Sequence, residues 1–142
     1  MSPFEPATRA YAPLMAALHA ASFETPWSEQ AFQDLLNLPT TIGLVNETGF
    51  ILCTIVADEA EILTLCVRPD CRRRGIASAL LREMETCLKN CNAHHFFLDV
   101  RVSNQPALDL YLKNGFSQVA RRRGYYATAV GPEDALILKK EL

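Results

Sequence analysis

Three consecutive arginines, Arg72 to Arg74, stand between an apolar run and a long amphipathic segment. In that segment apolar residues recur every three or four positions from Ile76 to Cys91, which predicts a helix that starts after Gly75. The first backbone N–H groups of a helix lack intrahelical partners and carry partial positive charge. With guanidinium groups around them, and with Gly75 and Ala77 leaving room for close approach, they predict a site for a diphosphate.

This motif does not fit the two best-known phosphate-binding loops. A P-loop requires Gly-Lys-Ser/Thr, and the Rossmann fingerprint requires glycines at a different spacing. The alternative is that the arginines are solvated side chains on a loop, which is common for such runs. The order of the neighbouring elements therefore carries more weight than the motif itself.

The rest of the chain predicts helices and strands that alternate through its middle. Helices are expected where apolar residues follow helical spacing after a capping residue, and strands where β-branched and apolar residues cluster between turn residues. The expected helices cover 11–23, 29–36, 76–91 and 105–113, with Ser28 and Asn104 as caps; the expected strands cover 41–45, 50–57, 61–67, 96–102, 116–120 and 135–138, with a polar loop between the last two. This order predicts a mixed α/β (α+β) sheet with helices on both faces.

Length and composition indicate one globular domain over residues 1–142. Of the 142 residues, 49% are hydrophobic and 21% charged, so the chain can bury a core and is unlike a disordered or low-complexity chain. Its longest apolar runs, 50–57 and 62–67, are far shorter than the roughly 18 residues that a membrane-spanning helix needs. The N-terminal residues lack the basic and apolar regions of a secretory signal, which favours a cytoplasmic location.

The five cysteines indicate free thiols rather than a disulfide framework. Their number is odd, and no Cys-x-x-Cys pair occurs. Cys87 and Cys91 lie one helical turn apart, but no matching His or Cys pair accompanies them. We therefore expect no metal.

Charge is distributed unevenly along the chain. Residues 1–66 hold eight acidic residues and one basic residue, Arg9, whereas residues 67–142 hold thirteen basic and eight acidic residues. This split predicts an anionic ligand on the second half and a cationic partner near the first. The net charge of -2 argues against a nucleic-acid contact dominated by the phosphate backbone.

The order of strand, Arg-x-x-Gly-x-Ala motif, long helix, strand and a short helix with Tyr111 resembles the GNAT superfamily of acetyl-CoA-dependent N-acetyltransferases. Three further segments are similar to the RimI-type ribosomal-protein-alanine N-acetyltransferases. They are Pro26-Trp27-Ser28, the run from Asp99 to Ala107 followed by Leu110-Tyr111, and Arg122-x-x-Tyr125-Tyr126 before Glu133-Asp134-Ala135. The similarity extends over about 23–138. The first motif identifies only the superfamily, and Trp27 with the Tyr-Tyr loop indicates the narrower group.

The resemblance implies a GNAT-type fold and a site for acetyl-CoA. The fold is a mixed, mostly antiparallel central sheet in which two parallel central strands splay apart. The diphosphate would lie against Arg72, Arg73, Arg74, Gly75, Ile76, Ala77 and Ser78. The pantetheine arm would pair with the backbone of Leu65, Cys66 and Val67 and hydrogen-bond Asn104, while the Val67 N–H would support the developing oxyanion.

The resemblance also assigns Asp99 and Tyr111 as catalytic residues. The family's general base is a glutamate at the position of Asp99, and because aspartate is one methylene shorter we expect it to act through a water. Tyr111 would protonate the departing sulfur or orient the thioester. Each residue has a structural alternative: an ion pair between Asp99 and Arg101, a core position for Tyr111, and a helix cap for Asn104.

Cys66 lies where the thioester would pass, so an acetyl-cysteine intermediate is a further alternative. No histidine neighbours it in the sequence, and His19, His94 and His95 cannot be placed beside it from the sequence. We therefore favour a buried thiol and direct attack by the amine.

The leading interpretation is an enzyme that acetylates the N-terminal alanine of a small-subunit ribosomal protein. Trp27 and Tyr125-Tyr126 would then wall the peptide groove, unless they are core or hinge aromatics. One alternative keeps the fold and acetyl-CoA but acetylates a lysine side chain or a small amine. The other is a catalytically silent module that binds CoA or RNA. The leading interpretation involves no membrane and no direct nucleic-acid partner.

Overall fold

The computed structural model describes residues 2–142, which form a seven-stranded sheet with the strand order β1-β2-β3-β4-β5-β7-β6. The strands are β1 (Glu5–Pro6), β2 (Thr41–Asn46), β3 (Gly49–Val56), β4 (Glu59–Val67), β5 (His95–Arg101), β6 (Ser117–Thr128) and β7 (Gly131–Glu141). Neighbouring strands are antiparallel except for β4 and β5, which run parallel. The predicted mixed, mostly antiparallel sheet is confirmed.

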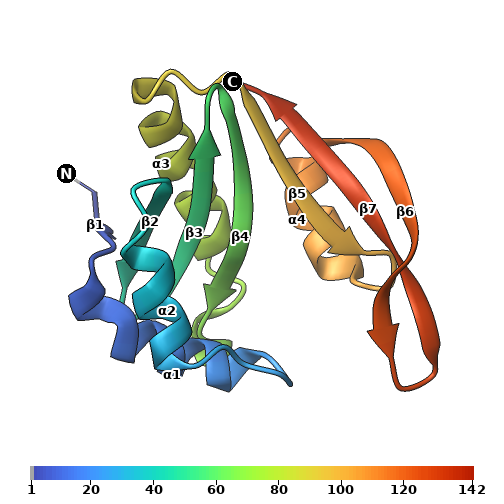
Figure 1. Cartoon of the computed structure of the whole chain (residues 1–142), viewed down its shortest axis with the longest axis horizontal. Coiled ribbons are helices and arrows are strands. Elements are labelled where there is room, and N and C mark those ends of the chain that lie inside the picture. Colours follow the sequence, from blue (N-terminus) through green and yellow to red (C-terminus); the bar gives the residue numbers. More distant parts are fainter. Residues whose placement is uncertain (1) are drawn as a thin grey trace.

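The two parallel strands separate soon after they meet. They pair only where Glu59–Glu61 lies beside His95–Phe97, and Figure 1 shows β4 and β5 diverging below this point. On its other side β4 carries a bulge, because Leu52 pairs with Thr64 and Cys53 pairs with Ile62, which leaves Leu63 without a partner. A bulge bends its strand and often lies beside a functional site. The predicted splayed pair is therefore present.

Helices cover both faces of the sheet, as predicted. Helices α1 (Ala12–Ser22) and α2 (Glu29–Leu36) pack on one face through a cluster that includes Met15, Phe32 and Phe50. Helices α3 (Ile76–Asn90) and α4 (Gln105–Lys113) pack on the other face through a cluster that includes Leu80, Met84, Phe96 and Leu108. Two 3-10 turns, η1 (Arg9–Tyr11) and η2 (Pro69–Cys71), precede α1 and α3. Within the described residues, no helix combines the length and apolarity required to cross a membrane.

Both predicted helix caps are confirmed. The Ser28 hydroxyl accepts the Ala31 N–H at 3.1 Å, and Asn104 Oδ1 accepts the Ala107 N–H at 3.2 Å. Each cap satisfies an N–H group that has no partner within its helix. The cap on α4 fixes the start of the helix that carries Tyr111.

The polar loop expected between the last two strands is wrong. Residues Arg121–Thr128 continue β6, which forms a long hairpin with β7. The side chains of β6 are mostly exposed because it is the edge strand, so its sequence lacks the apolar alternation that reveals a strand. Its order comes from backbone pairing with β7, for example Arg121 with Leu136. Tyr125 and Tyr126 consequently lie on a strand and not in a loop.

Candidate active site

A small cavity of about 160 Å³ lies at the start of α3, where the sequence predicts an anion site. Its lining is Val67, Cys71, Arg72, Arg73, Gly75, Ile76, Ala77, Ser78, Leu110 and Lys113. Most of the residues expected to hold a diphosphate are thus brought together, whereas Arg74 is not part of the lining. Leu110 and Lys113 come from α4 and were not expected.

The chain turns tightly before this helix. Arg73 and Gly75 both have left-handed backbone angles, with φ of 65° and 77°. Turns of this kind direct successive N–H groups toward a common centre and form anion-binding concavities. A Cβ built on Gly75 would meet no atom within 4 Å, so the backbone there is open to a ligand.

The charges around the small cavity are not neutralised by the protein. Among residues 2–142, no carboxylate forms an ion pair with Arg72, Arg73 or Lys113. The nearby carboxylate of Asp70 is bound instead by Arg68 at 2.6 Å, and this hydrogen bond lowers the pKa of Asp70. The small cavity therefore presents positive charge and the free N–H groups of α3 to solvent, which suits a diphosphate.

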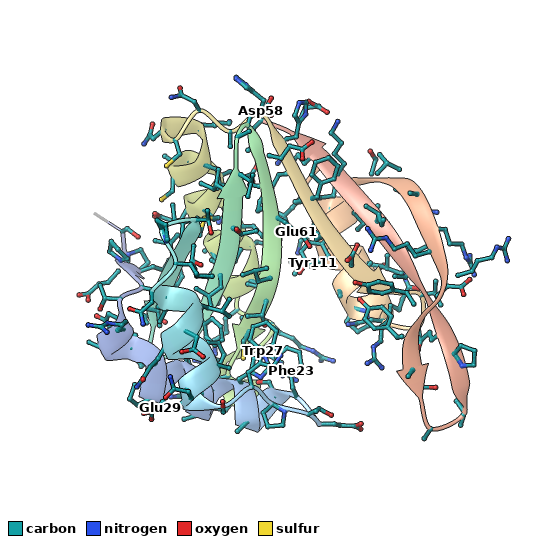
Figure 2. The ribbon with its side chains drawn as sticks, viewed as in Figure 1. Phe23, Trp27, Glu29, Asp58, Glu61 and Tyr111 are labelled. Atoms are coloured by element: carbon teal, nitrogen blue, oxygen red, sulfur yellow. The ribbon has the colours of Figure 1, made fainter. Side chains whose placement is uncertain are left out.

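A second cavity, of about 510 Å³, lies where β4 and β5 diverge; we call it the larger cavity because it exceeds the small cavity at the start of α3. Its lining brings together most of the remaining residues of interest: Ser22, Phe23, Glu24, Thr25, Ile62, Leu63, Thr64, Leu65, Leu98, Asp99, Val100, Arg101, Asn104, Ala107, Tyr111 and Tyr126. In Figure 2 the Tyr111 label lies in the space between the two strands. Asp99 comes from β5, and Tyr111 comes from the middle of α4.

Burial makes the Tyr111 hydroxyl a weaker acid than that of an exposed tyrosine. The residue is 8% exposed and its ring packs at 5.6 Å from that of Phe116. Removal from water raises the pKa of its hydroxyl well above the usual value of about 10. The side chain is therefore suited to donate a hydrogen bond into the larger cavity and poorly suited to give up its proton.

Asp99 is not held by the arginine that shares its strand. No ion pair joins Asp99 to Arg101 in the described part of the chain, and the Arg101 guanidinium lies 4.7 Å from the centre of the Tyr126 ring. The attraction between a cation and an aromatic face explains this orientation. The carboxylate of Asp99 thus remains available to a ligand.

A second carboxylate stands beside Asp99 that the sequence did not single out. Glu61 lines an adjoining cavity of about 570 Å³, which Asp99 and Arg122 also line. Burial and the negative charge of Asp99 raise the pKa of Glu61, while Arg122 acts in the opposite direction. Figure 2 places Glu61 beside the gap between the diverging strands.

Cys66 does not line the larger cavity. Its Sγ lies within hydrogen-bond distance of the Leu18 carbonyl oxygen, at 3.3 Å, and of Ser22 Oγ, at 3.4 Å, and burial raises the pKa of the thiol. A buried, protonated thiol is a poor nucleophile, which supports the expected direct attack. Among residues 2–142, no group of three or more His, Cys, Asp or Glu side chains gathers as metal ligands would.

The backbone of β4 is divided between the two cavities. Val67 lines the small cavity, whereas Ile62–Leu65 line the larger one beside Asp99 and Tyr111. The Val67 backbone, which was expected to stabilise an oxyanion, thus lies at the small cavity and not beside Asp99 and Tyr111. The part of β4 that lines the larger cavity with Tyr111 is Ile62–Leu65, which contains the bulge at Leu63.

The aromatic residues expected to wall a peptide groove have different positions. Trp27 lies 5.1 Å from the His19 ring and packs in the cluster beneath α1 and α2, while the segment just before it, Ser22–Thr25, lines the larger cavity. Tyr126 lines the larger cavity and Tyr125 the adjoining one. Trp27 therefore packs next to the Ser22–Thr25 segment and does not itself line the larger cavity.

His19 holds this segment in place, although its sequence position gave no sign of a role. Its Nδ1 accepts the Trp27 N–H at 3.1 Å, and its ring stacks on Phe23 at 4.1 Å. Burial lowers the pKa of His19, which favours the neutral ring that this hydrogen bond requires. Figure 2 shows Phe23 and Trp27 together near the lower end of β4.

The spacing along α4 contains a signal for two of the missed residues. Asn104, Ala107 and Tyr111 recur at three and four positions and line the larger cavity. Leu110 and Lys113 are three positions apart and line the small one. Because Tyr111 lines the larger cavity, the neighbouring stripe of α4 with Leu110 and Lys113 is a candidate to contact the same ligand.

Comparison with known proteins identifies the family of the chain. The model of the acetyltransferase (GNAT) family matches residues 12–116. The ribosomal protein bS18-alanine N-acetyltransferase of Salmonella typhimurium is 37% identical over 118 residues, covering 80% of this chain and 79% of that protein. The corresponding Escherichia coli K12 protein is 36% identical over 118 residues, with the same coverage of 80% and 79%.

Solved structures share the fold over nearly the whole chain. The ribosomal-protein-S18-alanine N-acetyltransferase from Escherichia coli has a TM-score of 0.89 at 29% identity, covering 99% of this chain and 94% of that one. Arabidopsis thaliana NAA60 in complex with acetyl-CoA has a TM-score of 0.85 at 22% identity, covering 98% and 97%. Because the family model spans most of the chain and bacterial relatives exceed 30% identity over most of both sequences, the chain belongs to the acetyltransferase (GNAT) family.

Proposed function

We propose that this enzyme transfers an acetyl group from acetyl-CoA to the N-terminal alanine of a ribosomal protein of the bS18 type. The observation that carries the proposal is the adjacency of two cavities, one cationic at the start of α3 and one containing Asp99 and Tyr111. The substrate comes from relatives at 36% and 37% identity that are named for bS18-alanine acetylation. Acetyl-CoA is supported by the family and by the neighbour that was crystallised with it.

Acetyl-CoA fits the residues present. Arg72, Arg73 and the N–H groups of residues 75–78 would bind the diphosphate, because they offer uncompensated positive charge in one cavity. Asn104 and the backbone of Leu65 line the larger cavity and would bind the pantetheine arm. The thioester would then lie between Asp99 and Tyr111. The acceptor amine would enter the larger cavity from the side opposite the coenzyme.

The reaction requires a neutral amine, and Asp99 would accept its proton. An N-terminal amine has a pKa of about 7.7 to 8.0 and lysine about 10.4, so presenting neutral lysine costs about 3.5 kcal/mol more. A carboxylate that acts through a water suffices for the N-terminal amine, whose neutral form costs less. The amine nitrogen forms a bond to the acetyl carbon as the carbon–sulfur bond breaks, and the amine proton passes to Asp99.

Tyr111 would stabilise the departing sulfur as a hydrogen-bond donor. A thiol resembling that of cysteine has a pKa of about 8.5, well below that of this buried tyrosine. Complete transfer of the Tyr111 proton to the thiolate is therefore uphill, and solvent supplies the final proton. The hydroxyl lowers the barrier by holding the sulfur and its developing charge.

The lining of the acceptor side favours a cationic N-terminal segment. Glu24 and Asp99 line the larger cavity, and Glu59 and Glu61 line the adjoining one. These carboxylates attract a protonated amine and the basic residues near it. Arg101 and Arg122 repel such groups and so restrict where a cationic peptide binds. Ribosomal protein termini are commonly basic, which agrees with this charge pattern.

The proposal is tested with purified protein, acetyl-CoA and two peptides. One peptide begins with a free alanine and carries no lysine; the other has a blocked N-terminus and one lysine. Mass spectrometry is expected to find acetyl on the first peptide and little on the second. Equal or preferential acetylation of lysine would contradict the assignment to N-terminal amines.

A further inference from the structure

The small cavity has a second wall, which comes from the last turn of α4. Leu110 and Lys113 line it opposite the arginine loop and the start of α3. The other side of α4, with Asn104, Ala107 and Tyr111, lines the larger cavity. One helix therefore contributes to both cavities, and its last turn adds to a site whose other residues belong to the end of β4, η2, the arginine loop and the first turn of α3.

Lys113 brings an uncompensated cation to this wall. Its side chain is exposed and has no ion-pair partner in residues 2–142, whereas Lys139 and Lys140 are each paired with a glutamate. Arg72 and Arg73 line the same cavity and are unpaired as well. Three cations around a volume of about 160 Å³ repel one another, and an anion bound between them offsets this repulsion.

Asn114 joins the two walls of the small cavity. Its Nδ2 donates to Ser78 Oγ at 3.1 Å and to the Leu110 carbonyl at 2.8 Å. Ser78 is buried, lies in the first turn of α3 and lines the small cavity. The Asn114 side chain thus connects the end of α4 to the segment that presents free N–H groups.

The same turn is held a second time from β7. Lys140 Nζ donates to the Asn114 carbonyl at 2.7 Å and pairs with Glu85 of α3 at 2.6 Å. Ser78 and Glu85 are seven residues apart, so they lie on one face of α3. The end of α4 is therefore fixed against α3 at two points, through Asn114 and through Lys140.

We propose that the last turn of α4 is part of the coenzyme's diphosphate site, with Lys113 as a phosphate-binding residue and Asn114 as the positioning residue that holds this turn to Ser78. The inference rests on the proposed use of acetyl-CoA. Lys113 supplies a charge-assisted hydrogen bond to a phosphate oxygen. Asn114 keeps the last turn of α4, and with it Lys113, beside Ser78 at the same cavity.

The role of Lys113 is tested by comparing two acetyl donors. S-acetylpantetheine has the same thioester as acetyl-CoA but no phosphate. Lys113→Ala is expected to lower kcat/KM for acetyl-CoA about tenfold, mainly through KM, and to leave kcat/KM for S-acetylpantetheine unchanged. Lys113→Arg restores most of the loss. Lys89→Ala, which removes another exposed lysine at the far end of α3, is the control and should change neither value.

The role of Asn114 is tested with a double-mutant cycle. Asn114→Ala and Ser78→Ala should each raise KM for acetyl-CoA about fivefold while kcat is retained, and the double variant should be no worse than either one. Asn114→Asp places a negative charge by the cavity and should raise this KM further, without affecting S-acetylpantetheine. Effects that multiply in the double variant, or that fall equally on both donors, would overturn the positioning role.

Calorimetry with CoA separates this inference from the proposed function. If the wild-type protein binds no CoA, the proposed function fails. If it binds CoA and Lys113→Ala binds it equally well, only the role of α4 is refuted. Weaker CoA binding by Lys113→Ala, with unchanged binding by Lys89→Ala, supports the inference.

Discussion

Lys140 Nζ lies 2.6 Å from Glu85 Oε1 and joins the last strand to the middle of α3. The Glu85 side chain is only 10% exposed, and Lys140 is its ion-pair partner. The same nitrogen donates to the Asn114 carbonyl at the end of α4. The pair therefore connects β7 to the two helices that line the small cavity.

Lys140→Met is expected to lower the free energy of unfolding by about 2 kcal/mol, because it leaves the Glu85 carboxylate largely buried and unpaired. Lys139→Met is the matched control. Lys139 pairs with Glu141, whose side chain is 66% exposed, so its loss should cost no more than about 0.5 kcal/mol. Urea unfolding of both variants measures the difference, and equal effects would contradict a structural role for the Glu85 pair.

The stability of the α1–α2 segment is expected to fall on acidification because of His19. Burial lowers the pKa of His19 below its usual value near 6.5, so its contribution is complete above that pH and is lost as the pH falls through the lowered pKa. Protonation also opposes acceptance of the Trp27 N–H.

The test compares the wild type with His19→Asn, which retains an acceptor that does not titrate. Urea unfolding at pH 7.5 and 5.5 should show a smaller loss of stability for the variant. Both proteins retain His94 and His95. The difference between their losses of unfolding free energy therefore reports on His19 alone. Parallel losses in the two proteins would show that His19 is not the group responsible.

Asp99→Asn is expected to reduce kcat about a hundredfold, because an amide cannot accept the amine proton. Affinity for CoA should change little, since Asp99 lies in the larger cavity and not beside the diphosphate site. Asp99→Glu keeps the carboxylate and extends it by one methylene, so it should retain activity. Steady-state kinetics with an alanine-led peptide checks both variants; an unchanged kcat in Asp99→Asn would remove the residue from the mechanism.

Tyr111→Phe should lower kcat about fivefold while the KM for acetyl-CoA stays close to the wild-type value. The loss reflects one hydrogen bond to the departing sulfur, worth about 1 kcal/mol. The same variant should leave binding of CoA intact in calorimetry. A hundredfold loss would indicate full proton donation by Tyr111, and no loss would assign the tyrosine to packing against Phe116 alone.

Much of the fold could be predicted because local signals coincide with the final structure. Ser28 and Asn104 have the side chains that cap helices and do so here, and the helix after Gly75 follows its apolar spacing through to Asn90. The extent of β6 could not be predicted, since an edge strand needs no apolar alternation. Its residues from Arg121 onward are ordered by partners on β7 that are distant in the sequence.

The candidate site was predictable where one segment supplies a complete chemical pattern, as in Arg73 to Ser78. It was not predictable where the contribution depends on how helices pack. Lys113 reaches the small cavity only because α4 is fixed against α3, and His19 acquires its role by meeting Trp27 across a loop. Glu61 joins Asp99 because β4 and β5 run side by side before they diverge.

The most direct test of the account is a crystal structure of the chain with CoA covalently joined to the N-terminus of an alanine-led peptide. The account predicts the diphosphate against Arg72, Arg73 and residues 75–78, the sulfur beside Tyr111, and the acceptor nitrogen within one water of Asp99. A diphosphate bound away from the start of α3, or a nitrogen remote from Asp99, would contradict it.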